Sequence, residues 1–314
     1  MSLSLRARAF LKLCLLFKRF LAPLNEDQLI KALRLATSSK AMAGVPGGTE
    51  VNACKMNGVN CEWVLPKDYA KSSRILLYFH GGAYVAGTLD SHRDIVYHMA
   101  NRLGARAVSV DYRLAPEFAY PDPYDDAMNV YQFLLQQGED PNQIIFAGDS
   151  AGAHLSIMTV RKVIDAGLPR PMALMAFSPF GDASNSLDSR QRNKDLDPLL
   201  PLPVLEKVLN LIVPNDRDPS DPEFSPINMS FDHFPPSFIN CGSLEILVDD
   251  AQLIHDAMLR DGIQSTLRIY PDMPHAFIVC GKIFPEGRQA QHHACDWFSN
   301  LPDAARSYEQ YQAP

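Results

Sequence analysis

The sequence predicts an α/β fold in which helices cover both faces of a mostly parallel sheet. Short, almost continuously apolar runs alternate with longer stretches whose apolar residues recur at helical spacing. Strands that are apolar along their whole length are typical of a sheet buried on both faces, and parallel strands need helical crossovers. Such sheets place binding sites at the carboxyl ends of their strands, so we expect the functional residues there.

The predicted strands are two runs joined by a hairpin turn, followed by six apolar runs. Asn57-Gly58 is the turn signal, because both residues accept the positive φ of a two-residue hairpin. The expected strands cover residues 51–56, 61–65, 74–79, 105–111, 143–147, 173–177, 237–241 and 266–270. The expected crossover helices cover residues 95–103, 127–137, 155–166 and 251–261.

The N-terminal segment, residues 3–21, is predicted to form a basic amphipathic helix. Lys12, Lys18 and Arg19 interrupt its apolar stretch, and no small-residue cleavage site follows closely, which argues against a signal peptide. We expect the apolar face of this helix to cover a substrate pocket, and contact with a membrane surface is the alternative.

Two further segments lie outside the alternating pattern. A capping box formed by Asn25 and Gln28 predicts a second helix that runs to about residue 36. Residues 178–235 contain a polar loop and one helix near residues 204–213, but no good strand. An insertion of this length inside a compact domain is typical of a cap or lid.

The composition indicates an ordered globular protein of 314 residues, since 46% are hydrophobic and 21% are charged. A formal net charge of −7 argues against a nucleic acid as partner. No run reaches the ~18 apolar residues that a membrane span needs. We therefore expect a cytoplasmic protein without an obligatory membrane partner.

The six cysteines show neither zinc-site spacing nor the density of a disulfide scaffold. The predicted hairpin places Cys54 opposite Cys61, so these two thiols either form a disulfide or remain reduced. We favour reduced thiols, and we expect no metal.

Ser150 is the candidate nucleophile, because it stands in a Gly-x-Ser-x-Gly motif at residues 148–152. The motif follows a predicted strand and precedes a predicted helix, which is the context that a nucleophile elbow requires. An ordinary glycine-rich turn between a strand and a helix is the alternative interpretation.

A second glycine motif follows the third predicted strand and starts at His80. Small residues here allow backbone N–H groups to face a developing oxyanion. The candidate oxyanion-hole residues are Gly81, Gly82, Ala83 and Ala151, and the leading donors are the last three. We expect His80 to hold the loop in place.

His275 is the candidate general base among nine histidines. It lies in a loop just beyond the last predicted strand, where a base would reach the nucleophile. His154 is one helical turn after Ser150, and His292 and His293 lie on a terminal helix. We expect these three to be structural or solvated.

Glu245 is the candidate acid that orients the base. It lies nearest the end of the strand that precedes it, and Asp249 and Asp250 are its competitors. Asp249 is one helical turn further along, where we expect it to cap or pair on the helix.

These motifs resemble those of the hormone-sensitive-lipase-like esterases, also called bacterial family IV. The resemblance extends from Arg74 to the C-terminus. It rests on His80-Gly81-Gly82, on residues 111–117 (Asp-Tyr-Arg-Leu-Ala-Pro-Glu), on the motif at residues 148–152 and on Met273-Pro274-His275.

The resemblance implies an α/β-hydrolase fold with a mostly parallel eight-stranded sheet and a helical cap. It also implies hydrolysis without a cofactor, and structural roles for Asp111 and Arg113. Two departures from the family stand out. Ala83 replaces a third glycine, and Glu245 stands where the family commonly has an aspartate. On this basis residues 1–45 are expected to form a helical cap segment.

The same organisation assigns residues 46–314 to the catalytic domain and makes residues 178–235 its cap insertion. The expected function is a serine esterase that hydrolyses short- to medium-chain esters through Ser150, His275, Glu245 and an acyl-enzyme. The alternatives are an inactive ligand-binding receptor and an amidase or other acyl hydrolase. The expected partner is a small-molecule ester, and a homodimer is left open.

Overall fold

The computed structural model describes residues 3–21, 23–38 and 40–302. The two ends of the chain, and with them the outer limits of the predicted cap segment and catalytic domain, lie outside the described residues.

One eight-stranded sheet forms the centre of the molecule. Its strands are β1 (Glu50–Met56), β2 (Val59–Leu65), β3 (Ile75–Phe79), β4 (Arg106–Asp111), β5 (Ile144–Asp149), β6 (Ala173–Phe177), β7 (Ser237–Gly242) and β8 (Ser265–Tyr270). They lie in the order β1-β2-β4-β3-β5-β6-β7-β8. Only β2 pairs antiparallel with its neighbours β1 and β4, so the mostly parallel eight-stranded sheet is confirmed.

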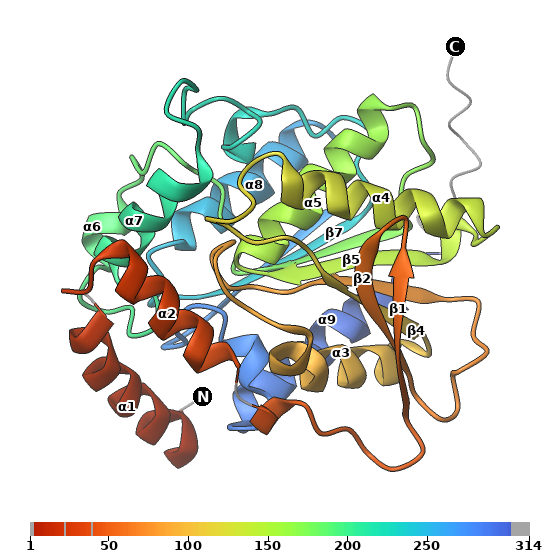
Figure 1. Ribbon diagram of the computed structural model, residues 1–314, viewed down its shortest axis with the longest axis horizontal. Coiled ribbons are helices and arrows are strands. Elements are labelled where there is room, and N and C mark those ends of the chain that lie inside the picture. The colour runs from red at the N-terminus through yellow and green to blue at the C-terminus, as the bar shows by residue number, and fades with distance from the viewer. Residues whose placement is uncertain (1–2, 22, 39, 303–314) are drawn as a thin grey trace.

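Helices cover both faces of this sheet, as predicted (Figure 1). On one face lie α3 (Leu89–Leu103) and α9 (Pro285–Ser299), and on the other lie α4 (Asp122–Gln136), α5 (Ala151–Asp165) and α8 (Val248–Arg260). The short helical turns are η1 (Lys40–Met42), η2 (Pro141–Gln143), η3 (Pro226–Asn228) and η4 (Phe277–Cys280). Each predicted crossover helix is present, and each begins three to six residues earlier than the apolar spacing alone indicated.

The hairpin between β1 and β2 has the predicted turn and register. Asn57 and Gly58 both have positive φ, at 45° and 89°. Cys54 lies opposite Cys61, as the two-residue turn requires. Both thiols are free, which agrees with the expectation of reduced cysteines.

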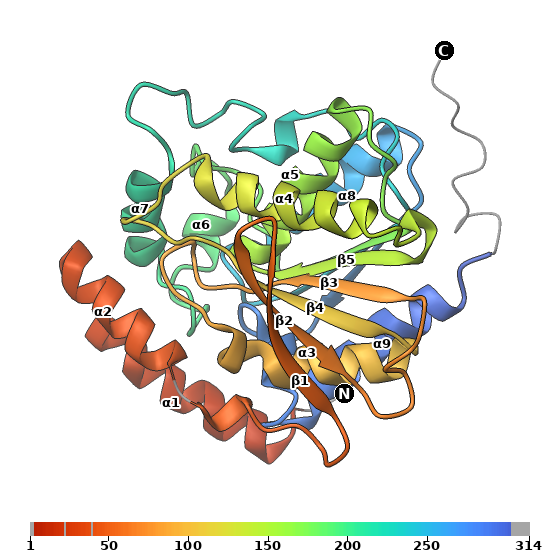
Figure 2. The same cartoon turned by 45° about the vertical axis from the view of Figure 1, so that its right-hand side comes forward.

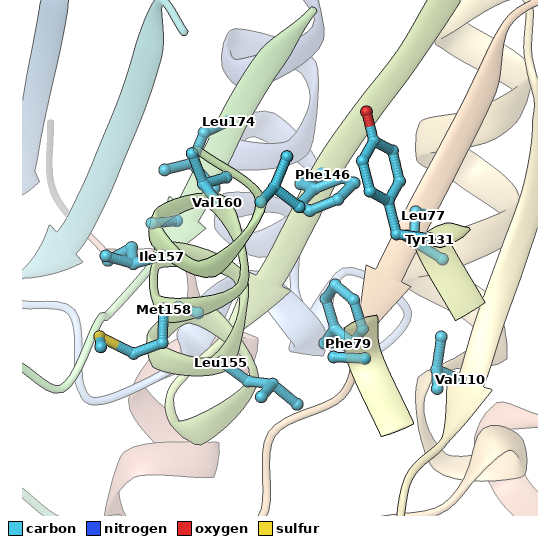
Figure 3. Close-up of a cluster of buried hydrophobic side chains, with 14 of the residues drawn as sticks. Leu77, Phe79, Val110, Tyr131, Phe146, Leu155, Ile157, Met158, Val160 and Leu174 are labelled. Carbon is cyan, nitrogen blue, oxygen red and sulfur yellow. The ribbon is translucent and has the colours of Figure 1, made fainter. Parts of the chain in front are cut away.

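The sheet is buried between two apolar cores, one on each face. Figure 3 shows part of the core between the strands and helices α4 and α5. In it, Phe79 and Phe146 from neighbouring strands meet edge to face, and the ring of Tyr131 from α4 packs on Phe146. This packing fixes the carboxyl ends of the strands against the helices that follow them.

The segments outside the alternating pattern are helical. The N-terminal helices are α1 (Leu5–Leu21) and α2 (Glu26–Thr37), and Asn25 with Gln28 forms the predicted capping box. Residues 178–235, all of which are described, contain α6 (Ser189–Arg192) and α7 (Leu202–Ile212) and no strand. Within the described residues, no helix is long and apolar enough to cross a membrane.

Candidate active site

Ser150 occupies a strained turn between β5 and α5. Its backbone has φ 53° and ψ −121°, a conformation that non-glycine residues rarely adopt. The flanking glycines permit this turn: a Cβ on Gly148 would lie 2.4 Å from the carbonyl oxygen of Gly152. A Cβ on Gly152 would lie 2.1 Å from the carbonyl oxygen of Phe79. The motif is therefore built as a nucleophile elbow, as its spacing predicts.

The structure brings together the three side chains that the sequence singled out. Ser150 Oγ lies 2.8 Å from His275 Nε2, and His275 Nδ1 lies 2.9 Å from Glu245 Oε2. The three residues follow β5, β8 and β7, so they meet at the carboxyl edge of the sheet. His275 can thus accept a proton from the serine while the carboxylate orients the ring.

Glu245 is fully buried and held by three donors. Besides His275, its carboxylate accepts hydrogen bonds from the Ser178 hydroxyl at 2.7 Å and from the backbone N–H of Gly242. The Ser178 hydroxyl also accepts the N–H of Ala276 at 3.0 Å, next to the base. Ser178 therefore joins the acid to the loop of the base, a role that its sequence position did not reveal.

The competing carboxylates have other partners. Asp249 Oδ1 on α8 lies 2.6 Å from the guanidinium of Arg192 on α6, so Asp249 pairs between two helices and not within its own helix as expected. Asp250 is fully buried and forms an ion pair with Arg190 at 2.6 Å. Neither carboxylate is hydrogen-bonded to the His275 imidazole, whereas Glu245 faces it directly.

The pKa of His275 lies above its ordinary value. Burial alone would lower that pKa, but the hydrogen bond and charge of Glu245 raise it, and the Asp197 carboxylate adds to the effect. The site therefore stabilises the protonated form of the His275 ring.

The predicted oxyanion loop does not offer all of its N–H groups to the nucleophile. The N–H of Gly81 donates to Asp149 Oδ1 at 3.1 Å. This N–H is therefore not available to an oxyanion, and Gly81 is no longer a candidate oxyanion donor. Gly82 and Ala83 both have positive φ, at 130° and 58°. A Cβ on Gly82 would lie 2.2 Å from the carbonyl oxygen of Ala86, so this position requires glycine.

Asp149 and His92 form a polar pair beneath this loop that sequence reasoning missed. The Asp149 carboxylate is buried, accepts the Tyr78 hydroxyl at 2.8 Å and lies 3.3 Å from His92 Nε2. Burial alone would lower the pKa of His92, yet the charge of Asp149 raises it. The only sequence signal for this pair was the position of Asp149, which is the variable residue before the serine in Gly-x-Ser-x-Gly.

His80 is structural, as expected. Its ring is fully buried, stacks on Tyr112 and lies 2.9 Å through Nδ1 from the Gly81 carbonyl oxygen. Burial lowers the pKa of His80 to about 4, so the ring is neutral at physiological pH. It fixes the loop that leads to Gly82.

Two of the other competing histidines, His154 and His293, are structural as well, and His292 is exposed. His154 is buried, and its two ring nitrogens lie 2.7 Å from the Tyr84 hydroxyl and 3.1 Å from the Phe224 carbonyl. Of the two expected roles, His154 therefore has the structural one and is not solvated. His293 lies 2.8 Å from the Tyr270 hydroxyl on the outer face of α9.

Arg113 binds Asp126 and is structural, as the family resemblance implied.

An apolar pocket of about 380 Å³ opens beside Ser150. Its walls come from the oxyanion loop, from the start of α5 and largely from the inserted segment that contains α7. The lining residues are Ala83, Tyr84, Ser150, Ala151, Phe180, Leu200, Leu205, Val208, Leu209, Ile212 and Leu247. An uncharged, mostly aliphatic group fits this lining.

The inserted segment also holds the loop of the acid in place. The Asn193 side-chain amide donates to the carbonyl oxygens of Ser243 at 3.1 Å and Glu245 at 2.7 Å. Asp197, which is fully buried, accepts the N–H of Ile246 at 3.1 Å. Only the fold reveals these contacts, because some fifty residues separate the partners.

Comparison with known proteins identifies the family to which this fold belongs. A family model described as an alpha/beta hydrolase fold matches residues 76–279. The chain belongs to this family. The match contains strands β4 to β8, all but the first residue of β3, the turn at Ser150 and the loops that carry Glu245 and His275. The predicted α/β-hydrolase fold is thereby confirmed.

Similar proteins show which members of the family this α/β hydrolase resembles. It is 34% identical to an acetyl-hydrolase of Streptomyces hygroscopicus, over 79% of this chain and 81% of the relative. It is 31% identical to an esterase of Acinetobacter venetianus, over 80% of this chain and 82% of the relative.

Solved structures give the same result. A crystal structure of an esterase from the bacterial hormone-sensitive lipase family has a TM-score of 0.85 and 28% identity, and the match covers 95% of this chain and 98% of that chain. A hormone-sensitive lipase from a metagenome library has a TM-score of 0.85 and 30% identity, with coverage of 95% and 99%. The resemblance to the hormone-sensitive-lipase-like esterases is confirmed, and this α/β hydrolase is a carboxylic-ester hydrolase.

Proposed function

We propose that this α/β hydrolase is a serine esterase that cleaves short- to medium-chain esters through Ser150, His275 and Glu245. The observation that carries the proposal is the continuous chain of contacts from the Ser150 hydroxyl through the His275 ring to the buried Glu245 carboxylate, at 2.8 Å and 2.9 Å. Each contact lies within the range in which a proton can be transferred or a tautomer fixed.

In the first step, Ser150 Oγ attacks the ester carbonyl while His275 Nε2 takes its proton. The N–H groups of Gly82, Ala83 and Ala151 stabilise the oxyanion of the tetrahedral intermediate. The imidazolium then protonates the leaving alcohol, and an acyl-Ser150 ester remains. Water attacks this ester with His275 again as base, which releases the acid and restores the serine.

The size of the acyl group is inferred from the pocket beside Ser150. Bulky side chains of α7, among them Leu205, Val208 and Leu209, line this pocket and limit the length of the acyl chain that fits. One relative is named an acetyl-hydrolase, which also favours small acyl groups. Catalytic efficiency should therefore be highest for acetyl to medium-chain esters and fall steeply towards palmitoyl.

We also propose that residues 1–45 and 178–235 together form the cap over this pocket. One apolar cluster supports this division, because it contains Leu21 and Leu29 of the first segment together with Leu205 and Leu209 of the second. Leu205 and Leu209 also line the pocket beside the nucleophile. The cap would thus exclude water from the bound acyl group.

The test combines Ser150→Ala with nitrophenyl esters of increasing acyl length. We expect turnover to fall to the background rate in Ser150→Ala, while the circular dichroism spectrum and thermal midpoint stay those of a folded protein. Turnover that survives in Ser150→Ala would identify another nucleophile. A wild-type preference for palmitoyl over butyryl esters would contradict the proposed substrate class.

A further inference from the structure

The solvent face of α1 carries an apolar stripe. Leu5, Leu13, Leu16 and Phe20 are 83%, 65%, 56% and 70% exposed. Their spacing of eight, three and four residues puts them on one side of the helix. Singly exposed apolar residues are common, but four large ones in one row on one helix indicate an interaction surface.

Basic side chains flank this stripe. Arg8, Lys12 and Arg19 form the neighbouring row, and Arg6 lies on the other edge. All four are exposed, and none of them forms an ion pair with a residue in the described part of the chain. The helix contains no acidic residue, although the whole chain carries a net charge of −7.

The opposite face of α1 is fixed to the body of the protein. Ala7, Cys14 and Leu21 are buried, and Phe10 packs against Phe284 with ring centroids 5.2 Å apart. Lys18, the remaining cation of the helix, donates to the Asp197 carbonyl at 2.8 Å. The helix therefore cannot turn its stripe inward without losing these contacts.

Figures 1 and 2 both place α1 at the periphery of the molecule, next to α2. We propose that the exposed face of α1 is a docking surface for an anionic lipid bilayer. In this arrangement Leu5, Leu13, Leu16 and Phe20 enter the boundary between headgroups and acyl chains, and the flanking cations contact anionic headgroups. Such a combination of apolar and basic rows is the pattern of helices that lie in a membrane interface.

Charge favours a bilayer over a second copy of this chain. A symmetric contact between two α1 helices would bring Arg8, Lys12 and Arg19 towards their own copies, and like charges at an interface oppose association. An anionic bilayer supplies apolar depth and negative charge at the same surface. The proposal does not depend on the esterase assignment, because none of these residues lines the pocket beside Ser150.

The test measures co-sedimentation of the full chain with vesicles of phosphatidylcholine that contain about 30% phosphatidylserine. We expect the wild type to bind these vesicles, to bind pure phosphatidylcholine much less, and to dissociate as NaCl rises from about 0.1 M to about 0.5 M. The triple variant R8E/K12E/R19E should lose on the order of 100-fold in partition coefficient.

A matched control reverses three exposed lysines elsewhere, as K55E/K67E/K71E, which changes the net charge equally. It should bind like the wild type, and both triple variants should keep the circular dichroism spectrum and thermal midpoint of the folded protein. A second variant, L13S/L16S/F20S, should also release the protein from vesicles.

Three results would overturn the proposal. The first is a wild type that does not sediment with anionic vesicles. The second is equal loss of binding in the two charge-reversal variants, since net charge alone would then explain it. The third is a dimer in solution that L13S/L16S/F20S dissociates while vesicle binding is unchanged, because the stripe would then be a protein interface.

Discussion

The carboxylate of Asp149 accepts the backbone N–H of Gly81 at 3.1 Å, so the residue before the nucleophile holds the start of the oxyanion loop. The same carboxylate binds the Tyr78 hydroxyl and lies beside His92. Through these contacts the turn at Ser150 and the loop at residues 80–83 keep a fixed spacing, which the proposed stabilisation of an oxyanion by Gly82 and Ala83 requires.

Asp149→Asn should impair catalysis more than binding. The amide keeps the shape of the carboxylate but loses its charge, which weakens the contacts to Gly81 and His92. Hydrogen bonds to charged groups contribute ~1.5–3 kcal/mol, so kcat should fall about 10- to 100-fold with a smaller change in KM. Steady-state kinetics on a soluble ester measures this. Tyr78→Phe, which removes one neutral donor, is the control and should cost less. An unchanged kcat in Asp149→Asn would make this carboxylate purely structural.

The pH dependence of kcat/KM should report His275. Because Glu245 raises the pKa of this histidine, activity should rise with pH at a midpoint above the ordinary histidine value of ~6.5. Glu245→Gln removes the negative charge that stabilises the imidazolium. The pKa of His275 must then fall, and the midpoint should move to lower pH.

The same substitution should lower kcat by roughly 10³-fold or more, since the tautomer is no longer fixed. Asp249→Asn is the matched control, because Asp249 pairs with Arg192 and does not contact the imidazole. If Asp249→Asn moved the midpoint and Glu245→Gln did not, the acid would be assigned to the wrong carboxylate.

Asn193→Ala should lower activity from outside the pocket. Its side chain donates to the carbonyl oxygens of Ser243 and Glu245, so its loss leaves two acceptors of the acid loop without this partner. We expect kcat to fall about tenfold and the free energy of unfolding to drop by ~1–3 kcal/mol. Asn228→Ala removes a comparable side-chain bond to a carbonyl in the same inserted segment. Equal losses of kcat in the two variants would contradict the positioning role of Asn193.

Ala83 should tolerate glycine but not a β-branched residue. Its φ of 58° is natural for glycine and strained for other residues, most of all for β-branched ones. Ala83→Gly should therefore stay within ~1 kcal/mol of the wild type in stability and keep its activity. Ala83→Val should destabilise the protein by about 1–3 kcal/mol and reduce turnover, as thermal unfolding and kinetics can measure. Full activity in Ala83→Val would mean that this loop can rearrange freely.

The fold could be predicted because its signals are local. The apolar run of β6 coincides with its predicted bounds, and the capping box at Asn25 gave the start of α2. The three proposed catalytic residues were also identifiable, since each follows a strand whose carboxyl end faces the same edge. Helix starts were placed too late, because first turns contain residues that do not continue the apolar spacing, such as Asp122 and Asp125 in α4.

The rest depends on contacts between distant segments. Gly81 was included among the oxyanion donors because nothing in its neighbourhood shows that Asp149 occupies its N–H. His154 could not be assigned from its helix position, since one of its partners comes from residue 224. The roles of Ser178 and Asn193 arise only when the inserted segment folds back onto the loop of Glu245.

The most direct test of the proposed mechanism is covalent labelling with diethyl 4-nitrophenyl phosphate, followed by peptide mass spectrometry. Attack by the serine oxygen displaces nitrophenolate and leaves a diethylphosphoryl group on the enzyme. The account predicts one group per chain, carried by Ser150, with labelling abolished in Ser150→Ala and strongly slowed in His275→Ala. A label on another residue, or equally fast labelling of Ser150 without His275, would contradict it.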